Sequence, residues 1–246
     1  MKKQTMIKES KTQKPSSVQE TAVFDFDGTL ISKDSYFEFN KRLISQSVAR
    51  SIFLVLALPL IIPLVCISAT RKYGFNVACF IAIFLQRKSL FRLRTEFIEY
   101  FLASPTVVYY DVLQAIIQSQ TNGQKVVFIS GCPKWLLSGL LKSIGVRNVK
   151  LVGTEQKLFL GTFVIKNHCY GANKIRMARI AGQQSKNWSI GYSDSPMDIP
   201  MLNLCKTAVL VNPSASCVKR FRHKLAVPYT HHYCDAKPEK SSPLFV

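Results

Sequence analysis

Short apolar runs alternate with amphipathic stretches over much of the chain. Five runs have the length and residue types of buried strands: 21–26, 125–129, 149–152, 188–191 and 207–211. The stretches between them predict helices at 133–144, 173–181, 195–205 and 217–224, and a hairpin at 157–165 broken at Gly161. Strands that alternate with helices predict a parallel sheet covered on both faces. The expected fold class is therefore α/β, with a doubly wound parallel sheet.

A long region with helical patterns separates the first strand from the second. Its stretches at 33–49, 89–102 and 106–120 are expected to be helices. The sheet is therefore expected to be assembled from both ends of the chain, with an α-helical cap inserted after the first strand. The expected organisation is a basic, disordered arm at 1–20, a core at 21–33 and 121–227, a cap at 34–120 and a tail at 228–246.

Two segments inside the expected cap contain no charged residue. Segment 51–70 is long enough to form about 30 Å of helix, roughly the thickness of the hydrocarbon core of a bilayer, but Pro59 and Pro63 predict a break or kink. Segment 73–86 is shorter, at about 21 Å as a helix. Basic residues surround both segments: Lys41, Arg42, Arg50, Arg71, Lys72, Arg87, Lys88, Arg92 and Arg94. This pattern is typical of a protein attached to an anionic leaflet.

The total charge agrees with an anionic partner. The chain has 33 Lys and Arg against 14 Asp and Glu, a formal charge of +19, and a surplus of this size attracts polyanions. The sequence contains neither basic residues interleaved with exposed aromatics nor a nucleic-acid reading motif, so a lipid surface is expected and nucleic acid is not. No obligatory protein partner is evident. The seven cysteines form no CxxC pair and are expected to be reduced thiols.

Carboxylates follow two of the expected strands. Asp25 and Asp27 come at the end of the first strand, and Asp194 and Asp198 follow the strand at 188–191. Ligands of such sheets bind outside the carboxyl ends of the strands, where these side chains are expected to converge. Carboxylate oxygens without Cys or His are the ligands that Mg²⁺ prefers.

Groups that suit a phosphate accompany these acids. Ser130 and Gly131 end the second strand, where a hydroxyl and free amides are expected at a helix N-terminus. Lys174 opens the helix after the hairpin. Together with the acids, these residues predict metal-assisted phosphoryl transfer, in which a carboxylate attacks phosphorus.

In this order, the residues resemble the four motifs of the haloacid dehalogenase (HAD) superfamily, in its phosphoserine-phosphatase-like branch. The match runs from Val23 to Asp198, and its first motif is Asp-Phe-Asp-Gly-Thr-Leu at 25–30. The resemblance implies a Rossmann-like sheet, with Asp25 as the nucleophile that becomes phosphorylated. It implies that Asp27 is the general acid and base, which protonates the leaving oxygen and then activates water.

The same resemblance implies the remaining roles. Mg²⁺ would be held by the Asp25 carboxylate, the Asp27 carbonyl, and Asp194 with Asp198 nearby, and the phosphoryl oxygens by Ser130, the Gly131 amide and Lys174. The chain departs from the family pattern at Cys132, where a second small hydroxyl is common. It departs again before Lys174, where Gly-Ala-Asn replaces an acidic residue, so Lys166 and Arg176 are basic alternatives.

The position of the cap bears on the substrate. Asp25 and Asp27 precede the two uncharged segments and the rest of the site follows them, so a single membrane crossing would divide the site between two sides of the bilayer. The inserted region therefore crosses the bilayer twice or not at all. Because the second segment is short and both flanks are basic, a helical hairpin at about 51–86, embedded in the cytoplasmic leaflet, is expected. The catalytic motifs together with the apolar run at 54–63 resemble the phosphatidylglycerophosphatase C family of bacterial inner membranes. This resemblance implies that phosphatidylglycerol phosphate is the substrate and that the site faces the cytoplasm.

Two alternatives remain open. The site could act on a soluble phosphomonoester such as phosphoserine, with the apolar segments forming a buried cap core. The chain could instead be a non-catalytic membrane-binding or regulatory protein, although such a protein has no need of both Asp25 and Asp27. His168 with Cys169, and His231 and His232 with Cys234, are of the types that bind zinc. No fourth well-spaced ligand accompanies either group, so no zinc site is predicted.

Overall fold

The computed structural model describes residues 19–67, 69–83, 86, 88–103, 108–160 and 162–234. The expectations for residues 1–18 of the arm, for Gly161, and for the tail beyond 234 lie outside the described residues. The strands in chain order are β1 (Thr21–Phe24), β2 (Lys125–Pro133), β3 (Lys150–Phe159), β4 (Thr162–Asn167), β5 (Trp188–Ser193), β6 (Thr207–Val211) and β7 (Tyr229–His232).

These strands form one seven-stranded sheet in the order β4-β3-β2-β1-β5-β6-β7. All neighbouring strands are parallel except β3 and β4, which are antiparallel. The first strand of the chain thus lies in the middle of the sheet, with β2 on one side and β5 on the other. The predicted α/β sheet is confirmed, and β7 is an additional edge strand within the expected tail.

The central strands are apolar because both of their faces are covered. Phe24 and Phe128 belong to the hydrophobic core on one face, while Val23 and Val127, one residue earlier, belong to the core on the other. All four side chains are fully buried. Since successive side chains of a strand point to opposite faces, burial on both faces gives a continuous apolar run.

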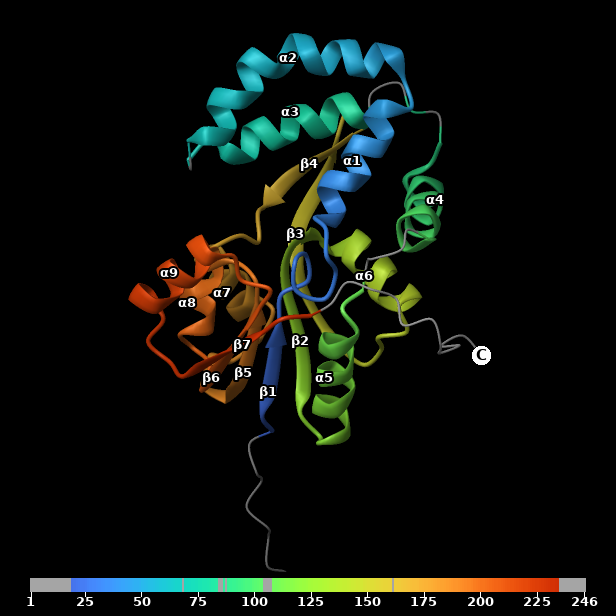
Figure 1. Cartoon of the computed structure of the whole chain (residues 1–246). Helices are drawn as coiled ribbons and strands as arrows, with labels where there is room; N and C mark the ends of the chain where they lie inside the picture. Colours follow the sequence, from blue (N-terminus) through green and yellow to red (C-terminus); the bar gives the residue numbers. More distant parts are fainter. Residues whose placement is uncertain are drawn as a thin grey trace, which may run out of the picture.

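Helices cover each face of the sheet (Figure 1). The core on one face takes its apolar residues from α5 (Tyr110–Thr121) and α6 (Lys134–Ser143). The other face is covered by α7 (Asn173–Ile180), α8 (Ile199–Leu202) and α9 (Ala215–Lys224). The structure therefore places α5 in the core and not in the cap. An amphipathic pattern predicts a buried face for this helix but not the surface against which it packs.

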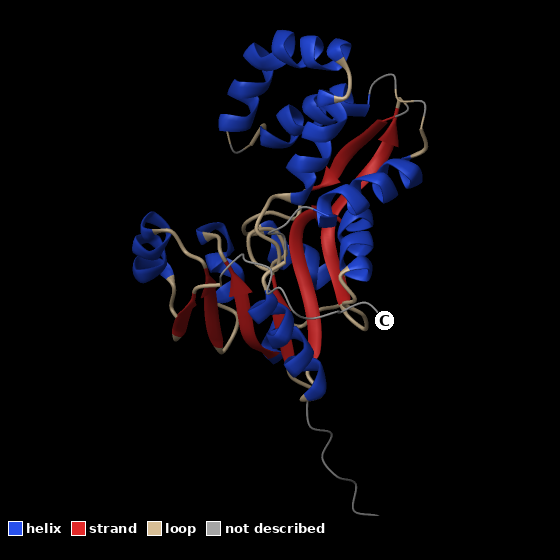
Figure 2. Ribbon diagram, turned by 45° about the vertical axis from the view of Figure 1, so that its right-hand side comes forward, coloured by secondary structure: helices blue, strands red, loops and turns tan. Residues whose placement is uncertain are grey.

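Four helices make up the cap: α1 (Ser35–Ser45), α2 (Val48–Cys66), α3 (Arg71–Ile83) and α4 (Leu90–Ala103). The single helix expected at 33–49 is divided, because Asp34 caps α1 and Ser47 caps α2. Helix α2 continues through both of its prolines, and its ribbon bends (Figure 1). It runs back along α3 and forms the outermost layer at the carboxyl end of the sheet (Figures 1 and 2).

The β3–β4 hairpin connects the core to the cap. It extends beyond the rest of the sheet to the level of the cap helices (Figure 2). The side chain of Asn76 on α3 accepts a hydrogen bond of 2.7 Å from the amide of Ile165 on β4. Strand β3 is longer than the expected 149–152, because β2 pairs with its first half and β4 with its second half. The cap is thus held over the edge of the sheet where the acidic residues lie.

Candidate active site

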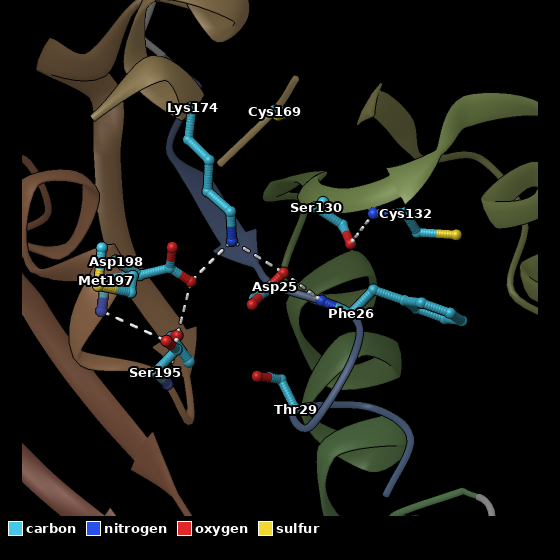
Figure 3. Close-up of polar contacts among 12 residues, drawn as sticks. Asp25, Phe26, Thr29, Ser130, Cys132, Cys169, Lys174, Ser195, Met197 and Asp198 are labelled. Atoms are coloured by element: carbon cyan, nitrogen blue, oxygen red, sulfur yellow. Dashed lines mark hydrogen bonds and ion pairs between the residues drawn. The ribbon is translucent and has the colours of Figure 1, made fainter. Parts of the chain in front are cut away.

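The first acid after β1 is paired with a lysine from α7. The amide of Asp25 still donates to the carbonyl of Tyr192 on β5, at 3.0 Å, so its backbone is fixed by the sheet. Lys174, in the first turn of α7, places its ammonium nitrogen 2.9 Å from Oδ1 of Asp25 and 2.7 Å from Oδ2 of Asp198 (Figure 3). All three side chains are buried. A single cation therefore bridges two carboxylates that come from different strand ends.

Burial and charge act in opposite directions in this group. Burial disfavours the charge on Lys174, but the carboxylates of Asp198 and Asp25 outweigh burial and hold the pKa of the lysine above its usual value. Burial raises the pKa of Asp25 well above its usual value; Lys174 opposes the rise, and Asp198 and Asp194 add to it. A further cation would therefore be stabilised here, because the carboxylates outnumber the lysine.

The second acid of the motif lies in the loop that leads to the cap. Asp27 forms an isolated bridge with Ile31, and its Oδ1 accepts a hydrogen bond of 2.9 Å from the amide of Ser35. Burial and the nearby carboxylate of Asp34 together raise the pKa of Asp27 to about 7, against the hydrogen bond from Ser35, which lowers it. A carboxyl group with this pKa can both give and accept a proton near neutral pH.

Asp194 approaches the loop after β1 very closely. Its amide donates to the hydroxyl of Thr29 at 3.1 Å, and that hydroxyl donates to Oδ1 of Asp194 at 3.3 Å. Gly28 adopts a positive φ of 75°, and a Cβ at this position would collide with the Asp194 carboxylate. Burial and the nearby carboxylate of Asp198 together raise the pKa of Asp194 to about 6.

Asp198 has a different environment from the other acids. Its Oδ2 accepts hydrogen bonds from Lys174 and, at 2.7 Å, from the hydroxyl of Ser193. With two donors on this one oxygen, the carboxylate fixes the position of the lysine.

The donors of this site suit Mg²⁺. The Asp25 and Asp194 carboxylates and the Asp27 carbonyl provide oxygen ligands only, as this hard cation requires, and they come from two adjacent strand ends. Asp198 can assist through the oxygen that Lys174 does not contact. The excess of carboxylates over cationic groups also agrees with a bound divalent cation.

Ser130 and Gly131 lie on the strand adjacent to Asp25, but not at a helix N-terminus as expected. Both belong to β2, and α6 begins only at Lys134. The buried hydroxyl of Ser130 accepts a 3.1 Å hydrogen bond from the amide of Cys132. The carbonyl of Gly131 accepts one of 2.6 Å from Thr154. The expectation of free amides here is therefore wrong for Cys132, because the serine side chain already binds its amide.

Sequence reasoning missed three residues that orient these side chains. They are Thr29, which contacts Asp194; Ser193, which contacts Asp198; and Ser35, whose amide contacts Asp27. Thr29 and Ser193 lie close in the sequence to the acids Asp27 and Asp194. This proximity is the sequence signal that could have identified them as contacts of the acids. The two basic alternatives to Lys174, Lys166 and Arg176, are both exposed.

Comparisons with known proteins show relatives of this chain and of its fold. A hydrolase of Mycobacterium leprae (strain TN) is 27% identical over 221 residues, covering 82% of this chain and 70% of that protein. A solved protein of unknown function from Bordetella pertussis Tohama I is similar in structure, with a TM-score of 0.68 and 15% identity, over 86% of this chain and 98% of that one. A phosphoserine phosphatase solved as a phospho-aspartyl intermediate analogue has a TM-score of 0.50 and 12% identity, over 82% and 90% of the two chains. These two structures, at such low identity, show a shared fold.

A family match covers most of the chain. The haloacid dehalogenase-like hydrolases match residues 22–203, a range that includes every acid described above together with Ser130, Gly131 and Lys174. The chain belongs to the haloacid dehalogenase-like hydrolase family.

Proposed function

We propose that this chain is a Mg²⁺-dependent phosphatase that works through a phosphorylated Asp25. The observation that carries the proposal is the buried contact of Lys174 with both Asp25 and Asp198. A buried lysine between two acids stabilises a centre that must hold a phosphate dianion next to a carboxylate. The phosphoserine phosphatase with this fold, solved as a phospho-aspartyl intermediate analogue, supports the same route.

In the first step, a carboxylate oxygen of Asp25 attacks phosphorus and the ester P–O bond breaks. The Phe26 amide and Lys174 already hold Oδ1 of Asp25, so the attack uses the other oxygen of the carboxylate. The leaving oxygen takes the proton of Asp27, whose pKa of about 7 leaves a large share of this carboxyl group protonated near neutral pH. Lys174 and Ser130 stabilise the phosphoryl oxygens, and Mg²⁺, when bound, supplies further positive charge to them.

In the second step, water hydrolyses the phosphorylated Asp25. Asp27 is now ionised and accepts a proton from the water, whose oxygen attacks phosphorus. The bond between phosphorus and the Asp25 oxygen breaks, which restores the carboxylate and releases phosphate. Asp27 ends the cycle protonated, ready for the next leaving group.

A lipid phosphate is the proposed substrate, most specifically phosphatidylglycerol phosphate at the cytoplasmic face of a bacterial inner membrane. Among the described residues, α2 is the one helix long and apolar enough to cross a membrane by length and composition, and only 11% of its apolar window is buried. Its side chains Val55, Leu56 and Leu60 are all more than half exposed. Soluble proteins rarely expose apolar surface of this extent without a partner.

The way in which α2 packs supports a position in one leaflet. Its inner face is held to α3, because the buried Arg50 donates a hydrogen bond of 3.0 Å to the carbonyl of Ala82. The helix therefore lies along the outside of the cap, and its remaining faces are available to lipid (Figure 1). The turn of the β3–β4 hairpin, at the level of the cap, also exposes Leu158, Phe159 and Leu160.

A soluble phosphomonoester is the second candidate, since the neighbour in fold is a phosphoserine phosphatase. The two candidates are separated by phosphate release from detergent-solubilised protein, with and without Mg²⁺. The substrates are phosphatidylglycerol phosphate, phosphatidic acid and phosphoserine, and Asp25→Asn serves as the inactive control.

Release from phosphatidylglycerol phosphate alone, lost with chelator and with Asp25→Asn, is the expected result. Release from phosphoserine alone would keep the mechanism and reject the lipid. Full activity of Asp25→Asn would reject the nucleophile.

A further inference from the structure

A group of side chains of the types that ligate metals lies outside the active site. Asp111 is in the first turn of α5, His232 ends β7, and Cys234 follows two residues later. One ligand atom from each of these residues lies within 4.8 Å of the others. Asp111 is far from the other two in the sequence, so the pattern of His231, His232 and Cys234 gave no indication of it.

The distances agree with a tetrahedral metal site. Nε2 of His232 lies 3.3 Å from Oδ2 of Asp111. Two ligands at about 2.0–2.1 Å from a tetrahedral zinc are separated by about 3.3 Å, and a zinc-bound sulfur at about 2.3 Å lies about 3.5 Å from either. The observed nitrogen–oxygen separation is therefore already that of a pair of zinc ligands, and the sulfur of Cys234 lies within 4.8 Å of both atoms.

The backbone of Cys234 is fixed although it lies outside the strand. Asn212 accepts a hydrogen bond of 2.8 Å from the amide of Cys234 and donates one of 3.3 Å to its carbonyl. The Asn212 amide itself donates to the carbonyl of His232, at 2.9 Å. One asparagine thus holds both ligand-bearing residues of this segment in place, which lowers the entropy that metal binding would otherwise cost.

We propose that Asp111, His232 and Cys234 form a zinc site. A thiolate and an imidazole favour zinc over Mg²⁺, so this site and the all-oxygen site around Asp25 select different metals. Three protein ligands leave the fourth tetrahedral position to water or to another ligand. Since α5 belongs to the core and β7 is the edge strand, the metal joins the end of the sheet to the helix layer on its face. Its role is to hold the segment after β7 in place.

Cobalt is the probe for this site, because tetrahedral Co²⁺ with a thiolate ligand gives intense visible bands and a sulfur-to-metal charge-transfer band. The full-length chain is reduced, stripped with chelator and titrated with Co²⁺ in excess Mg²⁺, so that the oxygen site is already filled. Zn²⁺ is then added to displace the cobalt. The expected result is one Co²⁺ per chain with a thiolate band, displaced by one equivalent of Zn²⁺.

Matched variants identify the ligands. Cys234→Ser removes the thiolate band, and His232→Ala and Asp111→Asn each weaken Zn²⁺ binding by at least about tenfold. His231→Ala is the control, because this histidine is adjacent on β7 but does not belong to the cluster, and it binds as the wild type does. Zn²⁺ also raises the melting temperature of the wild type and of His231→Ala, but not that of His232→Ala.

Two results would overturn the proposal. One is the absence of a thiolate band in the wild type, which leaves only a surface contact between His232 and Asp111. The other is a band or a Zn²⁺ affinity that Cys234→Ser and His232→Ala leave unchanged, which places the metal elsewhere.

Discussion

Lys174 lies 2.9 Å from Asp25, and the two residues come from elements that the chain places almost 150 positions apart. The lysine reaches Asp25 because β1 lies beside β5 in the middle of the sheet and α7 begins at the same edge. Its second contact, with Asp198, fixes the ammonium group from the opposite side. The positive charge of Lys174 is therefore held in place before any substrate binds. Such preorganisation is the condition for electrostatic stabilisation of a transition state.

Replacing Lys174 by methionine tests this role. The change leaves Asp25 and Asp198 buried without their cation, so we expect a loss of about 3–5 kcal/mol in stability. Turnover should fall by about 10²–10³-fold or more, because the phosphoryl oxygens lose a positive charge. Phosphate release and urea unfolding measure the two effects.

Two further sets of variants complete this test. Lys166→Met and Arg176→Met remove the exposed alternatives and should leave activity unchanged; a large loss with either one would mean that the lysine is wrongly assigned. Adding Asp198→Asn to Lys174→Met removes one uncompensated charge. This double variant should recover stability without recovering activity.

The sequence indicated where the acids of this site lie better than it indicated their detailed contacts. Asp25 and Asp194 could be placed at strand ends because the apolar runs before them are unambiguous. The contact between Thr29 and Asp194 could not be predicted, because it depends on the tight turn at Gly28 and on the pairing of β1 with β5. Whether Ser130 meets a helix N-terminus depends on where β2 ends, which residue types alone do not fix.

Two features of the fold differ from the prediction, each for its own reason. Strand β7 is Tyr-Thr-His-His, an edge strand with partly exposed side chains, so no apolar run marks it. Helix α5 has a clear amphipathic pattern, yet that pattern is equally compatible with a cap or a sheet as its partner. The contact of Asp111 with His232 requires both of these elements to be in place, so no local pattern could indicate it.

Gly28→Ala should disable the metal site through Asp194. The new Cβ collides with that carboxylate and moves it, so Mg²⁺-dependent turnover should be lost while the sheet remains intact. Gly123→Ala is the matched control, since its φ of 73° is similar but no atom lies within 4 Å of the new Cβ. Both variants bear the strain of a left-handed alanine, about 1–2 kcal/mol. Equal activity losses in the two would show that strain, and not Asp194, is responsible.

Thr29→Val tests the contact of Thr29 with Asp194 more gently. Valine keeps the shape of threonine but removes the hydroxyl that contacts both the amide and Oδ1 of Asp194. Mg²⁺ affinity measured from activity should fall by about 10–100-fold, and saturating Mg²⁺ should restore part of the rate. Thr162→Val is the control, because the buried hydroxyl of Thr162 has no hydrogen-bond partner among the described residues. The stability of Thr162→Val should equal or exceed that of the wild type. An unchanged Mg²⁺ affinity in Thr29→Val would contradict the proposed role of Thr29.

The pH dependence should report the proton on Asp27. Because its pKa is raised to about 7, the acid form dominates below that pH and declines tenfold per unit above it. We therefore expect kcat/KM for an alkyl phosphate to fall above about pH 7. The fall should be smaller for p-nitrophenyl phosphate, whose leaving group needs no proton.

Asp34→Asn should shift the pH at which kcat/KM begins to fall. The Asp34 carboxylate contributes to the raised pKa of Asp27, so its removal lowers that pKa and shifts the decline to lower pH. Asparagine can still cap α1 by accepting from the amide of Phe37, so the helix is retained. Identical pH profiles for the wild type and Asp34→Asn, with both substrates, would rule out Asp27 as the acid.

The last prediction concerns the binding of the exposed face of α2 to a membrane. Leu56→Asp together with Leu60→Asp places two charges on that face, away from the buried Arg50 that holds α2 to α3. Inserting these charges into lipid costs about 2.5–3.5 kcal/mol each at the membrane centre and less near the surface. Flotation with phosphatidylglycerol vesicles should therefore be lost, while release of phosphate from p-nitrophenyl phosphate is unchanged. Ile180→Asp, an equally exposed apolar position on α7 of the core, should float as the wild type does. If the double variant still floats, α2 is not the surface that meets the lipid.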